Sequence, residues 1–264
     1  MPDLDASLPT SLRALSEHLF LGPDVPCLVV RPEAGTAGNG TDPFPFLLWM
    51  HGRTATKELD PGRYLRLARA GIGTCAIDLP GHGERGSTAG MRPEALLDNI
   101  EQAASEIDDV VTALGRHGFD LDRMAIGGMS MGGMVALVRL QRPHRFRAAL
   151  LEATSGNWRV QQQRQFFDHE SADRLDPIQH LDRWRELPTL AVHSRKDEWV
   201  EFEGQLAFLD ALRTRVAHPE WIELLALEET GAPHEHLGFG RRTNDVKNRE
   251  LAFLNQHLLE AGRS

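Results

Sequence analysis

The chain has 264 residues, of which 41% are hydrophobic and 25% are charged, and its formal net charge is −9. This composition is typical of a globular protein, and the negative charge argues against a nucleic-acid partner. Residues 1–21 lack a basic segment followed by an apolar core, and no run of about 18 apolar residues is present, so neither a signal peptide nor a membrane span is expected. We therefore expect a cytoplasmic protein that does not bind a membrane. Cys27 and Cys75 lie in apolar runs and are expected to be buried free thiols.

The first half of the chain alternates apolar runs with amphipathic segments. The continuous apolar run Phe46–Met50 is typical of a central strand that is covered on both faces. Asp60-Pro61 indicates a helix start, because an N-cap residue is followed by proline at the first helical position. The other elements expected in this half are a short helix over 3–17, strands over 19–21 and 25–30, a loop over 31–45, a strand over 72–77 and an amphipathic helix from 93 to about 117.

The alternation continues in the second half and is interrupted once, over residues 154–187, which we interpret as a short helical lid. The other elements expected here are strands over 146–151, 189–193 and 220–227, a helix over about 200–215, a loop over 228–242 and a final helix over 245–260. Strands that alternate with helices predict an α/β fold with a mostly parallel central sheet and helices on both faces.

The motif that carries the chemistry lies between a short apolar strand at Met124–Gly127 and an apolar helical pattern that follows it. The connecting residues 128–132 read Gly-Met-Ser-Met-Gly, which is the G-x-S-x-G spacing. A serine at the apex of so sharp a turn needs small neighbours, because strand and helix approach each other closely there. The pattern predicts a nucleophile elbow with Ser130 at its apex and the Met131 amide at the positive end of the new helix.

A serine nucleophile needs a base within hydrogen-bond reach and a carboxylate that orients the base. Asp197 follows the expected strand 189–193, and His234 follows the expected strand 220–227, in the chain order serine, acid, histidine. Parallel strands bring both residues to the sheet edge that carries Ser130. The sequence therefore predicts a triad of Ser130, Asp197 and His234.

Each member of this triad except the serine has a competitor in the sequence. His236 competes with His234 for the role of base, and Glu152 and Glu198 compete with Asp197 for the role of acid. His234 and His236 together would make half a metal site, but no carboxylate or cysteine at ligand spacing accompanies them, so no metal is expected.

With these motifs in place, the chain resembles the α/β-hydrolases, and within them the single-domain esterases grouped with dienelactone-hydrolase and prolyl-oligopeptidase-like enzymes. The resemblance spans about residues 25 to 260. Its landmarks are His51-Gly52, the run Asp78-Leu79-Pro80-Gly81-His82-Gly83, the elbow at Ser130, and His193-x-x-x-Asp197-x-x-Val200 followed by the late histidine. It implies one α/β-hydrolase domain over residues 1–264 with a small lid insertion at about 154–187.

The resemblance also implies roles for single residues. Ser130 would attack the acyl carbon, His234 would take its proton and Asp197 would hold the imidazole, while the amides of Met131 and Arg53 would form the oxyanion hole, with Thr54 as an alternative to Arg53. This chain departs from the family pattern at Ser194, where many relatives have glycine, and at Glu201, where many have proline. Dienelactone hydrolases proper carry a cysteine nucleophile where this chain has Ser130.

The function expected from these features is hydrolysis of small, uncharged carboxylic esters through an acyl-enzyme, without metal or organic cofactor. Alternatives within the hydrolases are an aminopeptidase or acyl-peptide hydrolase and a thioesterase, and an alternative of another class is a hydrolase-like protein that binds a ligand without turning it over. Trp158, Phe166 and Phe167 are expected either to line an acyl pocket or to hold the lid down. The oligomeric state is left open.

Overall fold

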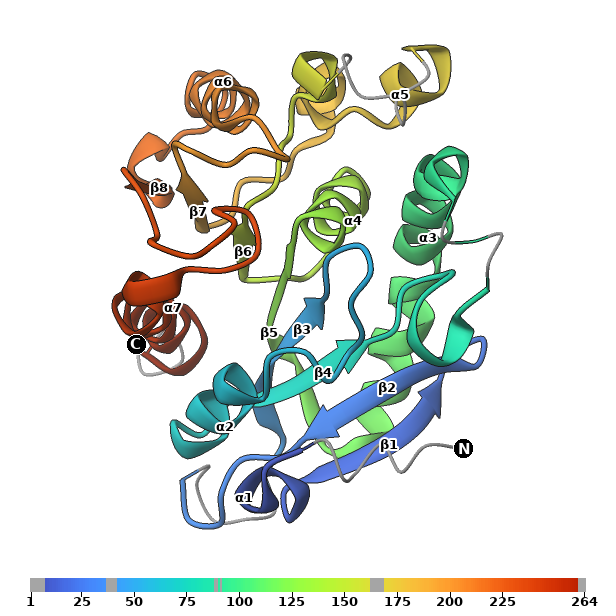
Figure 1. Ribbon diagram of the computed structural model, residues 1–264. Coiled ribbons are helices and arrows are strands. Elements are labelled where there is room, and N and C mark those ends of the chain that lie inside the picture. The colour runs from blue at the N-terminus through green and yellow to red at the C-terminus, as the bar shows by residue number, and fades with distance from the viewer. Residues whose placement is uncertain (1–7, 37–41, 88–89, 91, 162–168, 261–264) are drawn as a thin grey trace.

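An eight-stranded sheet runs through the computed structural model, which describes residues 8–36, 42–87, 90, 92–161 and 169–260. The strand order is β1-β2-β4-β3-β5-β6-β7-β8, as Figure 1 shows. β1 is antiparallel to β2 and β2 to β4, and the remaining neighbours are parallel. The strands are β1 (Ser16–Leu21), β2 (Val25–Val30), β3 (Phe44–Met50), β4 (Gly73–Ile77), β5 (Phe119–Met129), β6 (Ala148–Glu152), β7 (Thr189–Ser194) and β8 (Ile222–Leu227).

Helices cover both faces of this sheet (Figure 1). In Figure 1, α3 and α4 lie on one side of it, and α2 and α7 lie on the other. The α-helices are α1 (Thr10–Arg13), α2 (Pro61–Arg69), α3 (Leu96–Leu114), α4 (Met131–Leu140), α5 (His169–Leu175), α6 (Phe202–Arg213) and α7 (Thr243–Asn255), and short 3-10 segments include Trp158–Gln161 and Pro177–Arg183. The predicted α/β-hydrolase architecture, with a mostly parallel sheet, is confirmed.

The buried strand β3 shows how the two faces are filled. Leu48 and Met50 belong to an apolar cluster with side chains of α3, α4 and α6, whereas Leu47 and Trp49 belong to a second cluster with side chains of α1, α2 and α7. Successive side chains of a strand point to opposite faces, so a strand buried on both sides must be apolar at every position. This requirement explains the continuous apolar run that marks β3 in the sequence.

The beginning of the chain differs from its prediction. Instead of a helix over residues 3–17, the structure has the four-residue helix α1 and a strand that already starts at Ser16, while residues 1–7 lie outside the described part. β1 pairs with β2 from Ser16–Val30 to Leu21–Val25, around the predicted turn at Gly22. The backbone pairing with β2 therefore overrides the local helical spacing of leucines.

A buried cluster of charges joins α2, the end of β6 and α7. The Arg63 guanidinium donates to Glu152 and, at 3.0 Å, to Glu250, and Lys247 Nζ lies 2.8 Å from Glu152 Oε1. Burial and the neighbouring Glu152 charge raise the pKa of Glu250 well above its usual value, and the nearby Arg63 charge opposes this shift. Asp60 also belongs to this cluster, since its Oδ2 lies 2.9 Å from Arg63 Nε and 3.1 Å from Lys247 Nζ.

The segment between β6 and β7 folds around another buried carboxyl, that of Asp176. Its Oδ1 accepts a 3.0 Å hydrogen bond from the Trp158 amide, and its Oδ2 has no partner among the described groups. Burial raises the pKa of Asp176 to about 6. Between about pH 4 and pH 6 the folded chain therefore holds this proton more tightly than the unfolded chain, and stability falls as the pH rises through that window.

Asp176→Asn is expected to remove this pH dependence. At pH 7 the neutral amide avoids the cost of a buried charge and should raise the free energy of unfolding by roughly 1 to 3 kcal/mol, with a much smaller gain at pH 4. Thermal unfolding of both proteins across this range measures the difference. The exposed Asp182→Asn serves as the control, and an equal gain at both pH values would contradict the assignment.

Candidate active site

Ser130 lies at the apex of the turn between β5 and α4, with backbone angles of φ 53° and ψ −119°. Two hydrogen bonds hold this unusual conformation: the Ser130 amide donates to the Glu152 carbonyl at 2.9 Å, and Thr154 Oγ1 donates to the Ser130 carbonyl at 2.8 Å. A non-glycine residue with positive φ is costly and persists where the surroundings fix it. The turn thus presents the hydroxyl at the carboxyl edge of the sheet.

The glycines on either side of Ser130 are required by close contacts. A Cβ atom on Gly128 would lie 2.4 Å from the carbonyl carbon of Gly132, and one on Gly132 would lie 2.3 Å from the Met50 carbonyl oxygen. Both distances are shorter than any carbon contact in a folded protein, so these positions exclude side chains. The G-x-S-x-G spacing in the sequence follows from the packing of α4 against β5 and β3.

The structure brings Ser130 together with one imidazole and one carboxylate. His236 Nε2 lies 2.9 Å from Ser130 Oγ, and His236 Nδ1 lies 2.8 Å and 3.0 Å from the two carboxylate oxygens of Asp197. A carboxylate only accepts hydrogen bonds, so Nδ1 carries the proton and Nε2 is left to accept from the serine hydroxyl. This is the tautomer that a general base requires.

The Asp197 side chain is fully buried and is held by its own loop and by a second histidine. Its Oδ1 accepts from the amides of Trp199 and Val200, both at 2.8 Å, and its Oδ2 lies 3.2 Å from Nε2 of the buried His193. Burial alone would raise the pKa of Asp197, but the hydrogen bonds from His193 and His236 lower it well below its usual value. The Asp197 carboxylate is therefore ionised at neutral pH. Its contact with His193 was not predicted from the sequence.

The predicted base His234 is not the histidine at the serine, and this prediction is corrected to His236. His234 is exposed and its Nδ1 lies 3.2 Å from Glu198, on the outer side of the same loop. Both residues follow β8 at a similar distance in the sequence, so only the conformation of the loop separates them.

The competing acids are placed elsewhere. The Glu152 side chain lies in the charge cluster with Arg63 and Lys247, and only its backbone carbonyl contacts Ser130. Glu198 pairs with the exposed His234. Of the three carboxylates considered, Asp197 alone hydrogen-bonds the histidine that contacts Ser130.

The proposed oxyanion donors both border the serine. Met131 is the first residue of α4, so its amide has no acceptor within the helix. Arg53 follows Gly52, at which a Cβ atom would stand only 3.4 Å from the Ser130 Cβ. These positions agree with the predicted roles of the two amides, which remain a prediction.

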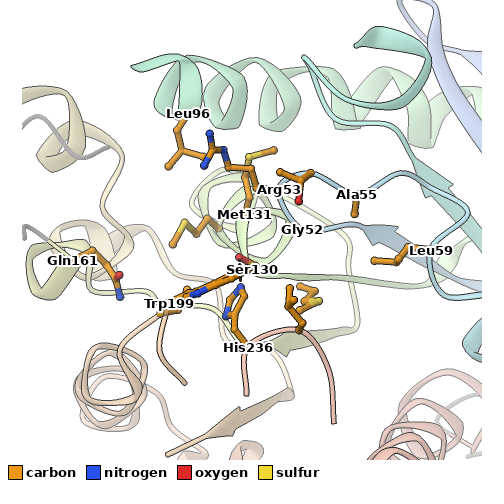
Figure 2. Close-up of a pocket in the computed structure, with 15 residues that line it drawn as sticks. Gly52, Arg53, Ala55, Leu59, Leu96, Ser130, Met131, Gln161, Trp199 and His236 are labelled. Atoms are coloured by element: carbon orange, nitrogen blue, oxygen red, sulfur yellow. Dashed lines mark hydrogen bonds between the residues drawn. The ribbon is translucent and has the colours of Figure 1, made fainter. Parts of the chain in front are cut away.

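A cavity of about 580 Å³ opens over Ser130 and His236, as Figure 2 shows. Most of its lining is apolar, and among the described lining residues Arg53 carries the only permanent charge. In Figure 2 the Arg53 side chain extends toward Leu96, on the side of the cavity away from Trp199 and His236. The described lining residues are Gly52, Arg53, Thr54, Ala55, Leu59, Leu96, Met129, Ser130, Met131, Met134, Gln161, Trp199, Val200, His236 and Leu237.

Trp158, one of the three aromatic residues predicted to contact substrate, does not line the cavity. Trp158 is fully buried in the apolar core and donates from its ring nitrogen to the Ser155 carbonyl, so its predicted substrate contact is corrected to a structural role. Phe166 and Phe167 lie outside the described residues. Among the described residues that line the cavity, the large aromatic side chain is that of Trp199. Its ring centroid lies 5.0 Å from that of His236.

Asp78 and His51 support the loops around the cavity. Asp78 is buried and accepts from the Lys57 amide and ammonium, at 3.0 Å and 2.9 Å, and from the Glu84 amide at 3.0 Å. Burial lowers the pKa of His51 to about 4, and its Nε2 accepts from the Leu79 amide. The carboxylate thus ties the loop after β3 to the loop after β4.

Comparison with known proteins shows the family to which the chain belongs. The family model of the prolyl oligopeptidase family matches residues 62–261, which is most of the chain. The chain belongs to the prolyl oligopeptidase family. It is 25% identical over 256 residues to the esterase YjfP of Escherichia coli, a match that covers 89% of this chain and 96% of that protein.

Solved structures of similar proteins share the fold of this member of the prolyl oligopeptidase family. The protein TT1662 of Thermus thermophilus superposes with a TM-score of 0.69 at 25% identity and covers 92% of this chain and 98% of its own. A puromycin-hydrolyzing peptidase of Mycobacterium tuberculosis superposes with a TM-score of 0.74 at 20% identity, but the match covers only 39% of that longer chain. The family and its esterase-named relative identify the chain as a serine hydrolase.

The described part of the chain contains neither a metal-binding cluster nor a membrane-spanning helix. Within the described ranges, no group of three or more histidine, cysteine, aspartate or glutamate side chains is placed to hold a metal ion. The helices described for this chain include none that is both long and apolar enough to cross a membrane.

Proposed function

We propose that this chain is a carboxylesterase that cleaves small, uncharged carboxylic esters through an acyl-enzyme intermediate. The observation that carries the proposal is the continuous line of hydrogen bonds from Ser130 Oγ to His236 Nε2 at 2.9 Å, and from His236 Nδ1 to the ionised Asp197. A serine hydroxyl alone is a poor nucleophile at neutral pH, and this arrangement supplies the base and its orientation.

In the proposed reaction, Ser130 Oγ attacks the ester carbonyl carbon while His236 takes the hydroxyl proton. The amides of Met131 and Arg53 stabilise the negative charge on the former carbonyl oxygen. His236 then gives its proton to the alcohol oxygen, the carbon–oxygen bond breaks and the acyl group stays on Ser130. Water then attacks the acyl carbon while His236 takes its proton. His236 returns this proton to Ser130 Oγ as the bond between Oγ and the acyl carbon breaks, and the acid is released.

The cavity supports a compact and largely apolar substrate. Its volume of about 580 Å³ falls within the range of small-molecule sites, and most of its described lining consists of aliphatic and sulfur-containing side chains. We further propose that the segment 154–187, which contributes Gln161 to the lining, roofs this cavity as a lid within a single domain over residues 1–264.

Burst kinetics test the proposal. Wild-type protein mixed with 4-nitrophenyl acetate, butyrate or octanoate should release about one equivalent of 4-nitrophenol rapidly, because these activated esters acylate a serine faster than the acyl-enzyme is hydrolysed. A fluorophosphonate should label the peptide that contains Ser130, and Ser130→Ala should lose both the burst and the label. We expect the acetate and butyrate to react faster than the octanoate, and steady hydrolysis by Ser130→Ala would overturn the proposal.

Hydrolysis of aminoacyl amides is the second candidate, because the family model and the Mycobacterium tuberculosis relative carry peptidase names. Alanyl 4-nitroanilide and an acyl thioester, assayed beside the 4-nitrophenyl esters, distinguish these activities. A folded protein that binds these compounds but is not labelled at Ser130 would instead indicate a ligand-binding protein.

A further inference from the structure

Two loops of complementary charge face each other beside the proposed triad. We call residues 194–200 the acid loop, since they carry Asp197, and residues 228–237 the base loop, since they carry His236. Three exposed pairs connect them: Arg195–Glu228 at 3.0 Å, Lys196–Glu229 at 2.7 Å and Glu198–His234 at 3.2 Å. Exposed pairs of this kind contribute little to stability individually.

A fourth pair lies on the inner side of the loops and is built differently. Ser194 Oγ donates a 2.5 Å hydrogen bond to Glu235 Oε2, and the Ser194 side chain is buried. The same carboxylate accepts from the amides of Thr230 at 2.7 Å and Gly231 at 3.2 Å. Although partial burial opposes ionisation, the hydrogen bonds from Ser194 and Thr230 lower the pKa of Glu235, so that the carboxylate keeps its charge at neutral pH.

The two partners stand next to the residues that perform the proposed chemistry. Ser194 ends β7, and its carbonyl accepts from the Asp197 amide at 3.2 Å. Glu235 directly precedes His236. Its carboxylate accepts from the amides of Thr230 and Gly231 and so folds the base loop back on itself. One hydrogen bond therefore connects the backbone that carries the acid with the backbone that carries the base.

We propose that Ser194 and Glu235 are positioning residues that act together to set His236 at its hydrogen-bond distance from Ser130. This inference rests on the proposed function, because it assigns the pair a role in that same site. Proton transfer depends steeply on the separation of donor and acceptor, and a displacement of about 1 Å can reduce a rate by up to about a hundredfold. The pair also gives a physical reason why His236, and not His234, reaches the serine: Glu235 fixes the loop between them.

The test compares Ser194→Ala and Glu235→Gln with wild-type protein. We expect each to lower kcat for 4-nitrophenyl butyrate, and the rate of fluorophosphonate labelling at Ser130, by about tenfold to a hundredfold. KM should stay within about twofold, since neither residue lines the cavity. Ser194→Thr, which keeps the hydroxyl, should recover most of the rate.

The matched control is Glu229→Gln, which removes the same charge from the base loop at an exposed pair with Lys196. It should leave kcat and labelling unchanged. Circular dichroism and thermal unfolding show that each variant is folded, and rates are expressed per titratable active site, so that a loss of folded protein is not counted as a loss of rate.

The double variant decides whether the two residues act as a unit. If they do, Ser194→Ala combined with Glu235→Gln should be no slower than the more impaired single variant. Folded single variants with wild-type kcat and labelling rate would overturn the inference. Failure of the proposed function would look different. The wild-type protein itself would then not hydrolyse the esters, and Ser130→Ala would not reduce fluorophosphonate labelling.

Discussion

Replacing His236 by alanine is expected to lower kcat for ester hydrolysis by about 10⁴-fold or more, whereas His234→Ala should leave it within about twofold. His236 is the imidazole at 2.9 Å from Ser130 Oγ, and without it no base accepts the hydroxyl proton. His234 contributes an exposed pair with Glu198, whose loss costs little.

The two substitutions form a matched experiment, because they remove the same side chain two residues apart in one loop. Steady-state hydrolysis of 4-nitrophenyl butyrate and the rate of fluorophosphonate labelling measure the effect on each. Thermal unfolding shows whether both variants fold. If His234→Ala were the inactive variant, the base loop in solution would differ from the one described here.

The second large effect is expected for Asp197→Asn, at about 10⁴-fold in kcat. Asparagine retains the size of the side chain but presents an amide donor, so it no longer favours the His236 tautomer with the proton on Nδ1. The backbone donors Trp199 and Val200 can still bond to its carbonyl oxygen, so the loop should keep its shape. The loss should therefore appear in kcat while the melting temperature changes little.

Glu152→Gln provides the contrasting result. This substitution removes the charge that faces Arg63 and Lys247 in the buried cluster, and breaking a buried ion pair typically costs about 3 to 5 kcal/mol. We expect a clear loss of stability in chemical denaturation but nearly full kcat per folded molecule. Full activity in Asp197→Asn together with an inactive, folded Glu152→Gln would return Glu152 to the role of acid.

The sequence allowed the sheet and the elbow to be predicted because both depend on local requirements. A strand buried on two faces must be apolar throughout, as Phe46–Met50 is, and a nucleophile turn must have small residues at fixed positions, as Gly128 and Gly132 are. Asp197 follows a recognisable strand in the expected chain order. These features can be read without knowledge of any distant contact.

The choice of histidine could not be read in this way. His234 and His236 differ only in which side of a loop they occupy, and that depends on the hydrogen bond between Glu235 and Ser194, 41 residues away in the sequence. For Trp158 the sequence left two roles open, because a large aromatic residue in a predicted lid is consistent with either a wall of the acyl pocket or an anchor that holds the lid down. Trp199 lines the cavity instead. Its position two residues after Asp197 could have indicated from the sequence that it lies near the site.

The strand order has a consequence for how activity would fail under stress. Ser130 follows β5, which has a neighbour on each side. His236 follows β8, which is the last strand of the described sheet, pairs there with β7 and is half-buried over most of its length. Marginal strands detach at lower free-energy cost than central ones. In mild denaturant His236 would thus leave its position at the site while Ser130 stayed in place. Enzyme activity should therefore be lost before the core unfolds.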